Sequence, residues 1–170
     1  MRHPSTVVIV LKKRNKDWDI LFLKKTARNL WHANEVCFPG GRVEEGEDFL
    51  EAAIREFEEE VGVDRSHIKV VASIDKVETV STPFVIYPFV AVAVKDFEPK
   101  VDGVEIEEAF WIPLSEILKL YPFKEESYLY KGRVYKTYLI PWEGRIIWGA
   151  TARILSNFIA NMGKLPLDKD

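Results

Sequence analysis

The sequence predicts an α/β fold in which a mixed β-sheet lies between helices, as a three-layer α/β/α sandwich. Segments of strand length, rich in β-branched and apolar residues, recur along the chain. Two longer segments instead carry apolar residues at helical spacing, and several strand segments stand between them. Strands and helices mixed in this order build layered domains, because each element buries one apolar face against another.

The first strands are expected close to the start of the chain. Residues 6–11 are β-branched and apolar, which favours a buried strand. A polar turn at residues 12–19 would close a hairpin onto a second strand at residues 20–24. Residues 27–35 are then expected to form a loop, and residues 36–38 a short strand that leads into two glycines.

Residues 49–61 carry the clearest helical signals. Asp48 is a favoured N-cap residue, and Glu51 stands where a capping box makes its return contact. Gly62 follows at the position where helices commonly end in a left-handed residue. No proline interrupts the segment, so one continuous helix is expected.

The residues of this helix separate into faces at about 100° per residue. Four apolar side chains share the face expected to pack against the core: Leu50, Ile54, Phe57 and Val61. Three carboxylates share a neighbouring stripe, because residues three and four apart are adjacent on a helix: Glu56, Glu59 and Glu60. Glu58 is expected to point away from both faces, towards water.

The second half of the chain begins with further strands. A strand is expected at residues 68–74 and a long apolar strand at residues 84–94. Pro88 lies within the long segment, which indicates an edge strand or a bulge, because proline cannot donate a ladder hydrogen bond. Residues 107–112 are expected to form a short strand.

The remaining elements alternate between helix and hairpin. A short helix is expected at residues 116–120. Residues 128–130 and 134–140 are strand-like, and a glycine-containing turn is expected to join them as a hairpin. Residues 146–161 carry apolar positions at helical spacing and are expected to form the last helix.

Length and net charge limit the domain size and the classes of function that fit this chain. A chain of 170 residues is long enough for one domain with a sizeable core, expected at residues 1–162. The polar tail at residues 163–170 is expected to fray. A formal net charge of −3 disfavours a nucleic-acid-binding surface, but it does not exclude a polyphosphate substrate that arrives with a metal ion.

Composition also indicates the cellular compartment in which the protein is expected. Cys37 is the single cysteine, which excludes an intrachain disulfide and is typical of a protein in the reducing cytoplasm. It lies in an apolar run and no motif pairs it with a base, so a small buried hydrophobe is expected. The chain shows no signal-peptide pattern and no apolar run of about 18 residues, so no membrane contact is expected.

The three carboxylates on one helical stripe need an explanation. Like charges at this spacing destabilise a helix by roughly 0.2–0.5 kcal/mol per pair. A divalent cation removes this cost, and Mg²⁺ and Mn²⁺ prefer the hard oxygens that Glu56, Glu59 and Glu60 supply. The alternative is that residues 58–60 are a solvated acidic run at a helix end.

The surrounding residues favour the metal. Residues 41–63 fit the pattern G-x5-E-x7-R-E-U-x-E-E-x-G-U, where U is aliphatic or aromatic. Every specified position matches: Gly41, Glu47, Arg55, Glu56, Phe57, Glu59, Glu60, Gly62 and Val63. This is the signature of the Nudix hydrolases, and the chain resembles that family, whose fold is an α/β/α sandwich with the motif as a loop–helix–loop.

The resemblance implies an enzyme that hydrolyses a nucleoside diphosphate linked to a further group, with Mg²⁺ or Mn²⁺ as cofactor. Glu56, Glu59 and Glu60 are expected to bind the metal. Gly40 and Gly41 are expected to bring backbone carbonyls to the metal and the substrate, because glycine allows the chain to approach a ligand closely. The partner is then a small nucleotide, and many family members are homodimers.

Two further roles follow from the motif. Arg55 has a planar fork that binds a carboxylate through two contacts, and Glu47 is its candidate partner, so the pair would orient a motif glutamate. The general base is either a glutamate of the helix, which we favour, or a carboxylate from a later loop. The later candidates are Glu105, Glu107 and Glu108.

A second resemblance concerns the substrate. Residues 21–41 read LFLKKTARNLWHANEVCFPGG and resemble the segment LLTxR(S/A)x3Rx3Gx3FPGG of coenzyme A pyrophosphatases, without gaps. It departs from that segment at several positions, among which the two arginines fall at Lys25 and Leu30 and the glycine at Asn34. The candidate substrate-binding residues are Lys25, Arg28, His32, Gly40 and Gly41. The WGATARIL sequence near the C-terminus also resembles the closing helix of that subfamily.

Several alternatives stay open. The substrate would be coenzyme A or a derivative, giving phosphopantetheine and adenosine 3′,5′-bisphosphate, or else ADP-ribose or another nucleotide sugar. A Nudix module that senses a nucleotide without cleaving it is a third alternative, although such modules typically lose motif carboxylates. Trp31, Trp142 and Trp148 could stack on an adenine or pack in the core, and packing in the core or against a subunit is favoured for Trp148.

Overall fold

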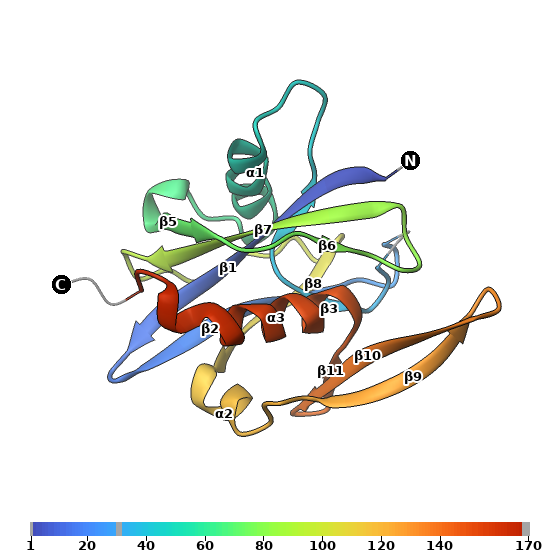
Figure 1. Ribbon diagram of the computed structural model, residues 1–170. Coiled ribbons are helices and arrows are strands. Elements are labelled where there is room, and N and C mark those ends of the chain that lie inside the picture. Colours follow the sequence, from blue (N-terminus) through green and yellow to red (C-terminus); the bar gives the residue numbers. More distant parts are fainter. Residues whose placement is uncertain (1, 30–31, 168–170) are drawn as a thin grey trace.

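The computed structural model describes residues 2–29 and 32–167, and it contains one central mixed sheet (Figure 1). Its main path runs β3-β2-β1-β7-β5, with β4 paired to β1, β6 to β7 and β8 to β2. β1 and β7 are parallel and the other pairs are antiparallel. The strands of this sheet are β1 (His3–Arg14), β2 (Asp17–Lys25), β3 (Val36–Cys37), β4 (Gly40–Arg42), β5 (Ile68–Ser73), β6 (Val77–Glu78), β7 (Phe84–Ala93) and β8 (Ile106–Pro113).

Helices cover both faces of this sheet, and a smaller sheet projects from one end (Figure 1). Helix α1 spans Phe49–Val61, α2 spans Leu114–Leu118 and α3 spans Gly149–Asn161. The smaller sheet has the order β11-β10-β9. Its strands are β9 (Lys124–Tyr130), β10 (Arg133–Trp142) and β11 (Arg145–Ile147).

The apolar side chains of the central sheet form two clusters because successive residues of a strand face opposite sides. In β1, Val8 and Val10 belong to the cluster that includes Phe57 and Val61 of α1. Ile9 and Leu11 of the same strand belong to the cluster that includes the buried residues of α2 and α3. The predicted three-layer α/β/α sandwich is therefore confirmed.

Helix α1 has the predicted bounds and most of the predicted caps. The Asp48 carboxylate accepts a hydrogen bond from the Glu51 N–H at 3.2 Å. Gly62 ends the helix with φ of 72°, and its N–H donates to the Glu58 carbonyl. The predicted return contact of Glu51 is not the one observed, because its carboxylate pairs with Arg65 at 2.9 Å instead.

The buried face of α1 differs from the predicted stripe. Leu50 is 38% exposed, whereas Ala52 and Ala53 are fully buried. Small side chains allow the helix backbone to approach the sheet closely, so the alanines rather than Leu50 mark the contact face. Glu58 points to the surface as expected, where it accepts hydrogen bonds from Arg65.

The first hairpin is longer than predicted. Strand β1 continues to Arg14 and β2 begins at Asp17, so the turn is confined to Asn15 and Lys16. Asn15 has a φ of 57°, which asparagine tolerates better than most residues. The residues predicted as a turn thus extend both strands. Residues 13–16 are exposed, whereas Asp19 is buried and Trp18 packs partly against the core.

Pro88 was predicted to mark an edge strand or a bulge. The edge strand is wrong, because β7 lies between β1 and the pair β5 and β6, but the β5–β7 ladder shifts register between Val70 and Ala72 nearby. The Pro88 carbonyl accepts a hydrogen bond from the Ile74 N–H at 3.1 Å. Ile74 lies just after β5 and before β6, where the ladder is interrupted. The missing N–H of Pro88 therefore costs no ladder bond.

The C-terminal elements differ from their predicted bounds. The short helix is α2, which begins two residues earlier than expected and immediately follows β8. The hairpin of β9 and β10 is confirmed around Lys131 and Gly132. The last helix begins at Gly149, because the preceding segment forms β11 and pairs with β10.

The tail after α3 packs where the structure describes it. A 3₁₀ turn at Met162–Lys164 follows the helix. Leu165 and Leu167 are partly buried against the core cluster, so residues 163–167 do not fray as expected. In the part of the chain with described coordinates, no helix is long and apolar enough to cross a membrane.

Gly62 provides a test of the α1 C-cap. A Cβ there would lie 2.4 Å from the Lys100 carbonyl oxygen, in addition to the strain of φ at 72°. We expect Gly62→Ala to lower the free energy of unfolding by about 2–4 kcal/mol, from strain and overpacking together. The measurement is urea denaturation followed by circular dichroism.

Gly103→Ala is the matched control, because Gly103 has a φ of 76° but a Cβ there meets nothing within 4 Å. We expect this variant to lower the free energy of unfolding by about 1 kcal/mol, because it adds only the backbone strain. Equal losses in the two variants would contradict the predicted contact between the Gly62 position and Lys100.

Candidate active site

A cavity of about 380 Å³ opens between the motif, one end of the sheet and the start of α3. This is the size range of small-molecule sites. Lining residues come from β1, the segment around β3 and β4, α1, the loop after β6, β10 and α3. The cavity therefore joins parts of the chain that are far apart in sequence.

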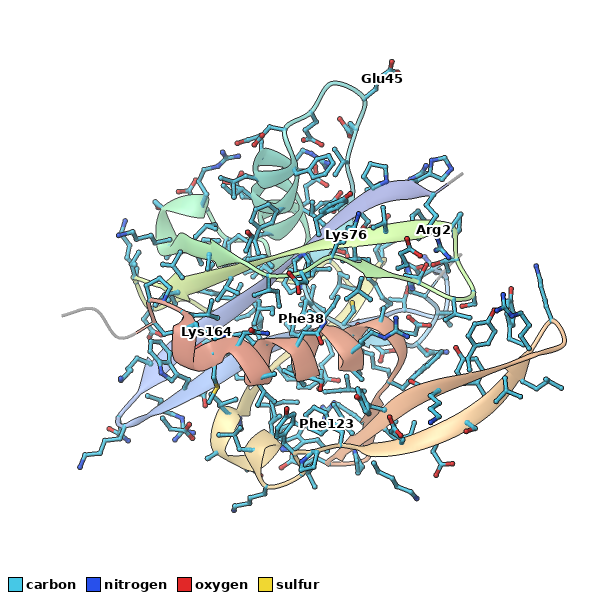
Figure 2. The ribbon with its side chains drawn as sticks, viewed as in Figure 1. Arg2, Phe38, Glu45, Lys76, Phe123 and Lys164 are labelled. Carbon is cyan, nitrogen blue, oxygen red and sulfur yellow. The ribbon has the colours of Figure 1, made fainter. Side chains whose placement is uncertain are left out.

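The motif glycines bring backbone close to this cavity. A Cβ on Gly41 would lie 2.4 Å from Cδ of Glu56, so only glycine leaves room for that carboxyl group. A Cβ on Gly40 would lie 2.1 Å from the Thr6 carbonyl oxygen, where β4 lies against β1. Figure 2 shows Glu45 at the outer end of the following loop, away from this site.

Glu60 is buried and held from two sides. The Gly40 N–H donates to Oε1 of Glu60 at 2.7 Å, and the Lys25 ammonium donates to Oε2. Burial opposes the charge of Lys25, but Cys37, Glu60 and Glu56 around it raise its pKa above the ordinary value. Lys25 is therefore a protonated partner that compensates the Glu60 carboxylate inside the protein.

Glu56 is a motif carboxyl group whose pKa is strongly raised by its surroundings. Burial and the neighbouring Glu60 carboxylate raise its pKa to about 7, and Arg55 only partly opposes them. Its neighbours Gly41 and Glu60 line the same cavity. A carboxyl group in this environment gains from any cation that enters the cavity.

Arg55 organises the rest of the motif. Its Nε and Nη2 bind the two oxygens of Glu47 at 2.7 and 3.0 Å. Its Nη1 lies 3.0 Å from Glu56 and 3.3 Å from Glu59. The hydrogen bonds from Arg55 and from the Glu44 N–H hold the pKa of Glu47 at about 2.

The donor set fits a divalent metal such as Mg²⁺ or Mn²⁺. Glu56, Glu59 and Glu60 supply hard oxygens, and Glu56 in particular lacks a full counter-charge. Among the described residues, however, no three His, Cys, Asp or Glu side chains already converge as a metal site. Lys25 and the Gly40 N–H engage both oxygens of Glu60, and the Glu59 side chain is 58% exposed beside Arg55.

The structure brings only some of the predicted residues to the cavity. Six of them line it: Lys25, His32, Gly40, Gly41, Glu56 and Glu60. Glu47, Arg55 and Glu59 lie behind or beside the lining, and Arg28 is exposed and does not line it. Leu30 and Trp31 lie outside the described residues.

Residues 32–34, upstream of the motif, form a turn. Nδ1 of His32 lies 2.9 Å from Oε2 of Glu35. Asn34 has a φ of 61°, a conformation in which asparagine is the common substitute for glycine. Cys37 is partly buried in the cavity wall, and burial raises its pKa to about 12, so its sulfur is a thiol.

The three glutamates considered as a general base from a later loop differ in whether they line the cavity. Glu105 lines the cavity. Glu107 pairs with Lys24 at 2.9 Å, and Glu108 pairs with Arg145. Of the three candidates for a general base from a later loop, only Glu105 reaches the cavity.

The sequence interpretation missed the wall opposite the motif. Lys136 and Thr137 of β10 line it, together with Trp148 and Arg153 at the start of α3. Trp148 was a candidate for stacking on an adenine, and its exposure of 43% contradicts packing in the core and leaves packing against a second subunit untested. Nothing in the local pattern links these residues to the motif, because the hairpin brings them there from about a hundred residues away.

The motif helix over a ligand-sized cavity on an α/β/α sandwich defines a hydrolase of the Nudix type. The family model described as NUDIX domain matches residues 1–131, and the chain belongs to this family. It is therefore a Nudix hydrolase of the pyrophosphatase class.

Two similar relatives share one description, uncharacterized Nudix hydrolase NudL. The Citrobacter koseri protein is 28% identical over 166 residues, which cover 97% of this chain and 85% of the relative. The Shigella flexneri protein is 26% identical over 167 residues, which cover 98% and 86%.

Solved structures share the fold. An Ap4A hydrolase binary complex from C. elegans aligns with a TM-score of 0.57 and 19% identity, over 71% of this chain and 87% of that one. The Nudix domain of Shewanella oneidensis NrtR, complexed with ADP ribose, aligns with a TM-score of 0.55 and 14% identity, over 70% and 77%. At these identities the likeness shows the fold alone.

The Glu47–Arg55 pair predicts an acid-sensitive stability. The pKa of Glu47 is about 2 in the fold and 4.5 in the ordinary group, so the pair stabilises the fold above pH 4.5. This contribution is lost as the pH falls through about 2. We expect Glu47→Gln to be less stable than the wild type near neutral pH, and the difference to shrink below pH 4.5.

The measurement is chemical denaturation of both proteins at a series of pH values. Glu45→Gln is the control, because it removes one charge from the same loop without touching Arg55. A difference in the free energy of unfolding between the wild type and Glu47→Gln that stays constant down to pH 2 would show that the pair does not stabilise the fold.

Proposed function

We propose that residues 1–162 act as one Nudix domain that hydrolyses the diphosphate of coenzyme A or a derivative, using Mg²⁺ or Mn²⁺. The products are phosphopantetheine and adenosine 3′,5′-bisphosphate. The observation that carries the metal-dependent chemistry is the position of Glu56, which stands in the cavity beside Glu60 with a pKa of about 7. The choice of coenzyme A rests on the segment upstream of the motif.

Each motif residue has a defined part in this proposal. Glu56, Glu59 and Glu60, with the Gly40 carbonyl, hold the metal. The bound metal neutralises the diphosphate and lowers the pKa of the attacking water. Arg55, held by Glu47, orients the Glu56 and Glu59 carboxylates, and it thereby limits their motion before the substrate arrives.

The upstream segment supports coenzyme A in spite of its departures from the subfamily pattern. Asn34 stands at the pattern's glycine and adopts the left-handed conformation that explains a glycine there. Lys25 stands at the first arginine and keeps its positive charge, which neutralises Glu60. These two departures therefore retain the local physical requirement, whereas another, Leu30, replaces a charge with an apolar side chain and lies outside the described residues. Arg28 is exposed outside the cavity, so substrate binding by Arg28 has no support from its position.

ADP-ribose or another nucleotide sugar is the second candidate. The same cavity accepts a diphosphate at the motif, and the NrtR Nudix domain with this fold is described in complex with ADP ribose. A module that only senses a nucleotide is the third. All motif carboxylates are retained in this chain, which favours an enzyme over a sensor.

The substrate is tested by incubating the purified protein with coenzyme A, ADP-ribose, NADH and nucleoside triphosphates, with and without Mn²⁺ or Mg²⁺. We expect metal-dependent release of phosphopantetheine and adenosine 3′,5′-bisphosphate, with kcat/KM for coenzyme A above that for every other substrate. Chromatography of the products is the measurement. Faster turnover of ADP-ribose would reject coenzyme A, and binding without any cleavage would favour the sensor.

Glu105 provides a test of the general base. If it activates the water, we expect Glu105→Gln to lower kcat by about 10²–10⁴-fold with little change in KM. Glu107→Gln is the matched control, because Glu107 is two residues away but pairs with Lys24 outside the cavity. Steady-state kinetics of both variants are compared with the wild type. Unchanged kcat in Glu105→Gln would assign the base to a glutamate of α1.

A further inference from the structure

The cavity is lined from both faces of the central sheet, which give it a motif end at α1 and a second end at β10 and α3. The motif end carries Glu56 and Glu60. The other end carries Lys136 from β10 and Arg153 from α3. The same two cations also line an adjoining hollow, which Glu125 and Asn157 border. A ligand that fills the cavity therefore meets a metal-binding end and a cationic end.

The two cations differ from Lys25 and Arg55, which both form ion pairs with motif carboxylates. Arg42 of β4 also lines the cavity without an ion pair, but it lies in the motif segment and contacts the Phe84 ring. Within residues 2–29 and 32–167, no carboxylate forms an ion pair with Lys136 or Arg153. Arg153 donates one hydrogen bond, to the Glu78 backbone carbonyl at 3.2 Å, which leaves most of its donors unused.

Two uncompensated cations in a ligand cavity are typical of an anion subsite, because lysine and arginine bind phosphate through charge-assisted hydrogen bonds. The substrate diphosphate belongs at the motif end, where the metal is held. An anion at the far end must therefore be a second phosphate on the same ligand. Trp148 beside it is 43% exposed and offers an aromatic face to an adenine.

We propose that Lys136 and Arg153 bind the phosphomonoester on the ribose of the nucleotide, which in coenzyme A is the 3′-phosphate. This inference rests on the proposed function and adds to it the residues that set the specificity. Coenzyme A carries such a phosphate, whereas dephospho-coenzyme A and ADP-ribose do not. The pair therefore selects among substrates that share the same reactive diphosphate.

The test is equilibrium binding of two product analogues by isothermal titration calorimetry. Adenosine 3′,5′-bisphosphate and adenosine 5′-monophosphate differ only in the 3′-phosphate. We expect the wild type to bind the bisphosphate at least about tenfold more tightly, as expected for hydrogen bonds to a charged group. We expect Lys136→Met and Arg153→Met each to reduce this preference several-fold, and the double variant to abolish it.

Lys131→Met is the control, because Lys131 lies at the tip of the same hairpin and outside the cavity. It removes one positive charge, so it separates a local subsite from a general effect of net charge. Thermal unfolding of every variant is recorded, and Lys136 is exposed, so its replacement leaves the fold intact. Equal affinity of the wild type for both nucleotides, or a preference that survives in the double variant, would overturn the subsite.

Turnover of coenzyme A and dephospho-coenzyme A separates this inference from the proposed function. We expect the wild type to prefer coenzyme A and the double variant to cleave both alike. Equal turnover of both by the wild type would overturn the subsite and leave the proposed function standing. A wild type that prefers the bisphosphate in binding but cleaves neither compound would support the subsite and reject coenzyme A as the substrate.

Discussion

The site depends on keeping several carboxylates close together inside a folded protein before any metal binds. Two cations make this possible. Lys25 neutralises the buried Glu60 from the sheet, and Arg55 joins Glu47, Glu56 and Glu59 on the helix surface. Without them, the repulsion and desolvation that raise the pKa of Glu56 would act on the whole group.

This arrangement also explains why the glycines and the first strands matter. The Gly40 N–H completes the contacts of Glu60, and the absence of a side chain on Gly41 makes room for Glu56. Lys25 is the last residue of β2, and this position at the end of a strand places its ammonium group beside Glu60 of α1. The motif therefore works only when the helix and the sheet pack in one register, which the two apolar clusters enforce.

The sequence was most informative where the causes are local. Asp48, Gly62 and the absence of proline predicted α1 to its exact bounds, because caps and propensity act within one turn. It was least informative where partners are distant. Pro88 lies in a central strand and α3 begins three residues late, because β1, β6 and β10 determine those environments. The cationic wall with Lys136 was missed for the same reason.

The two walls of the cavity have different mechanical support. The motif wall is tied to the central sheet, whereas β9 and β10 project from it as a small sheet (Figure 1). The Gly149 N–H donates to Oγ1 of Thr137 at 2.8 Å and links the start of α3 to this hairpin. A hairpin of this kind has little stability of its own, so the link and the β10–β11 pairing hold the wall in place. The wall formed by β10 and the start of α3 can therefore change in sequence without disturbing the carboxylates of the motif.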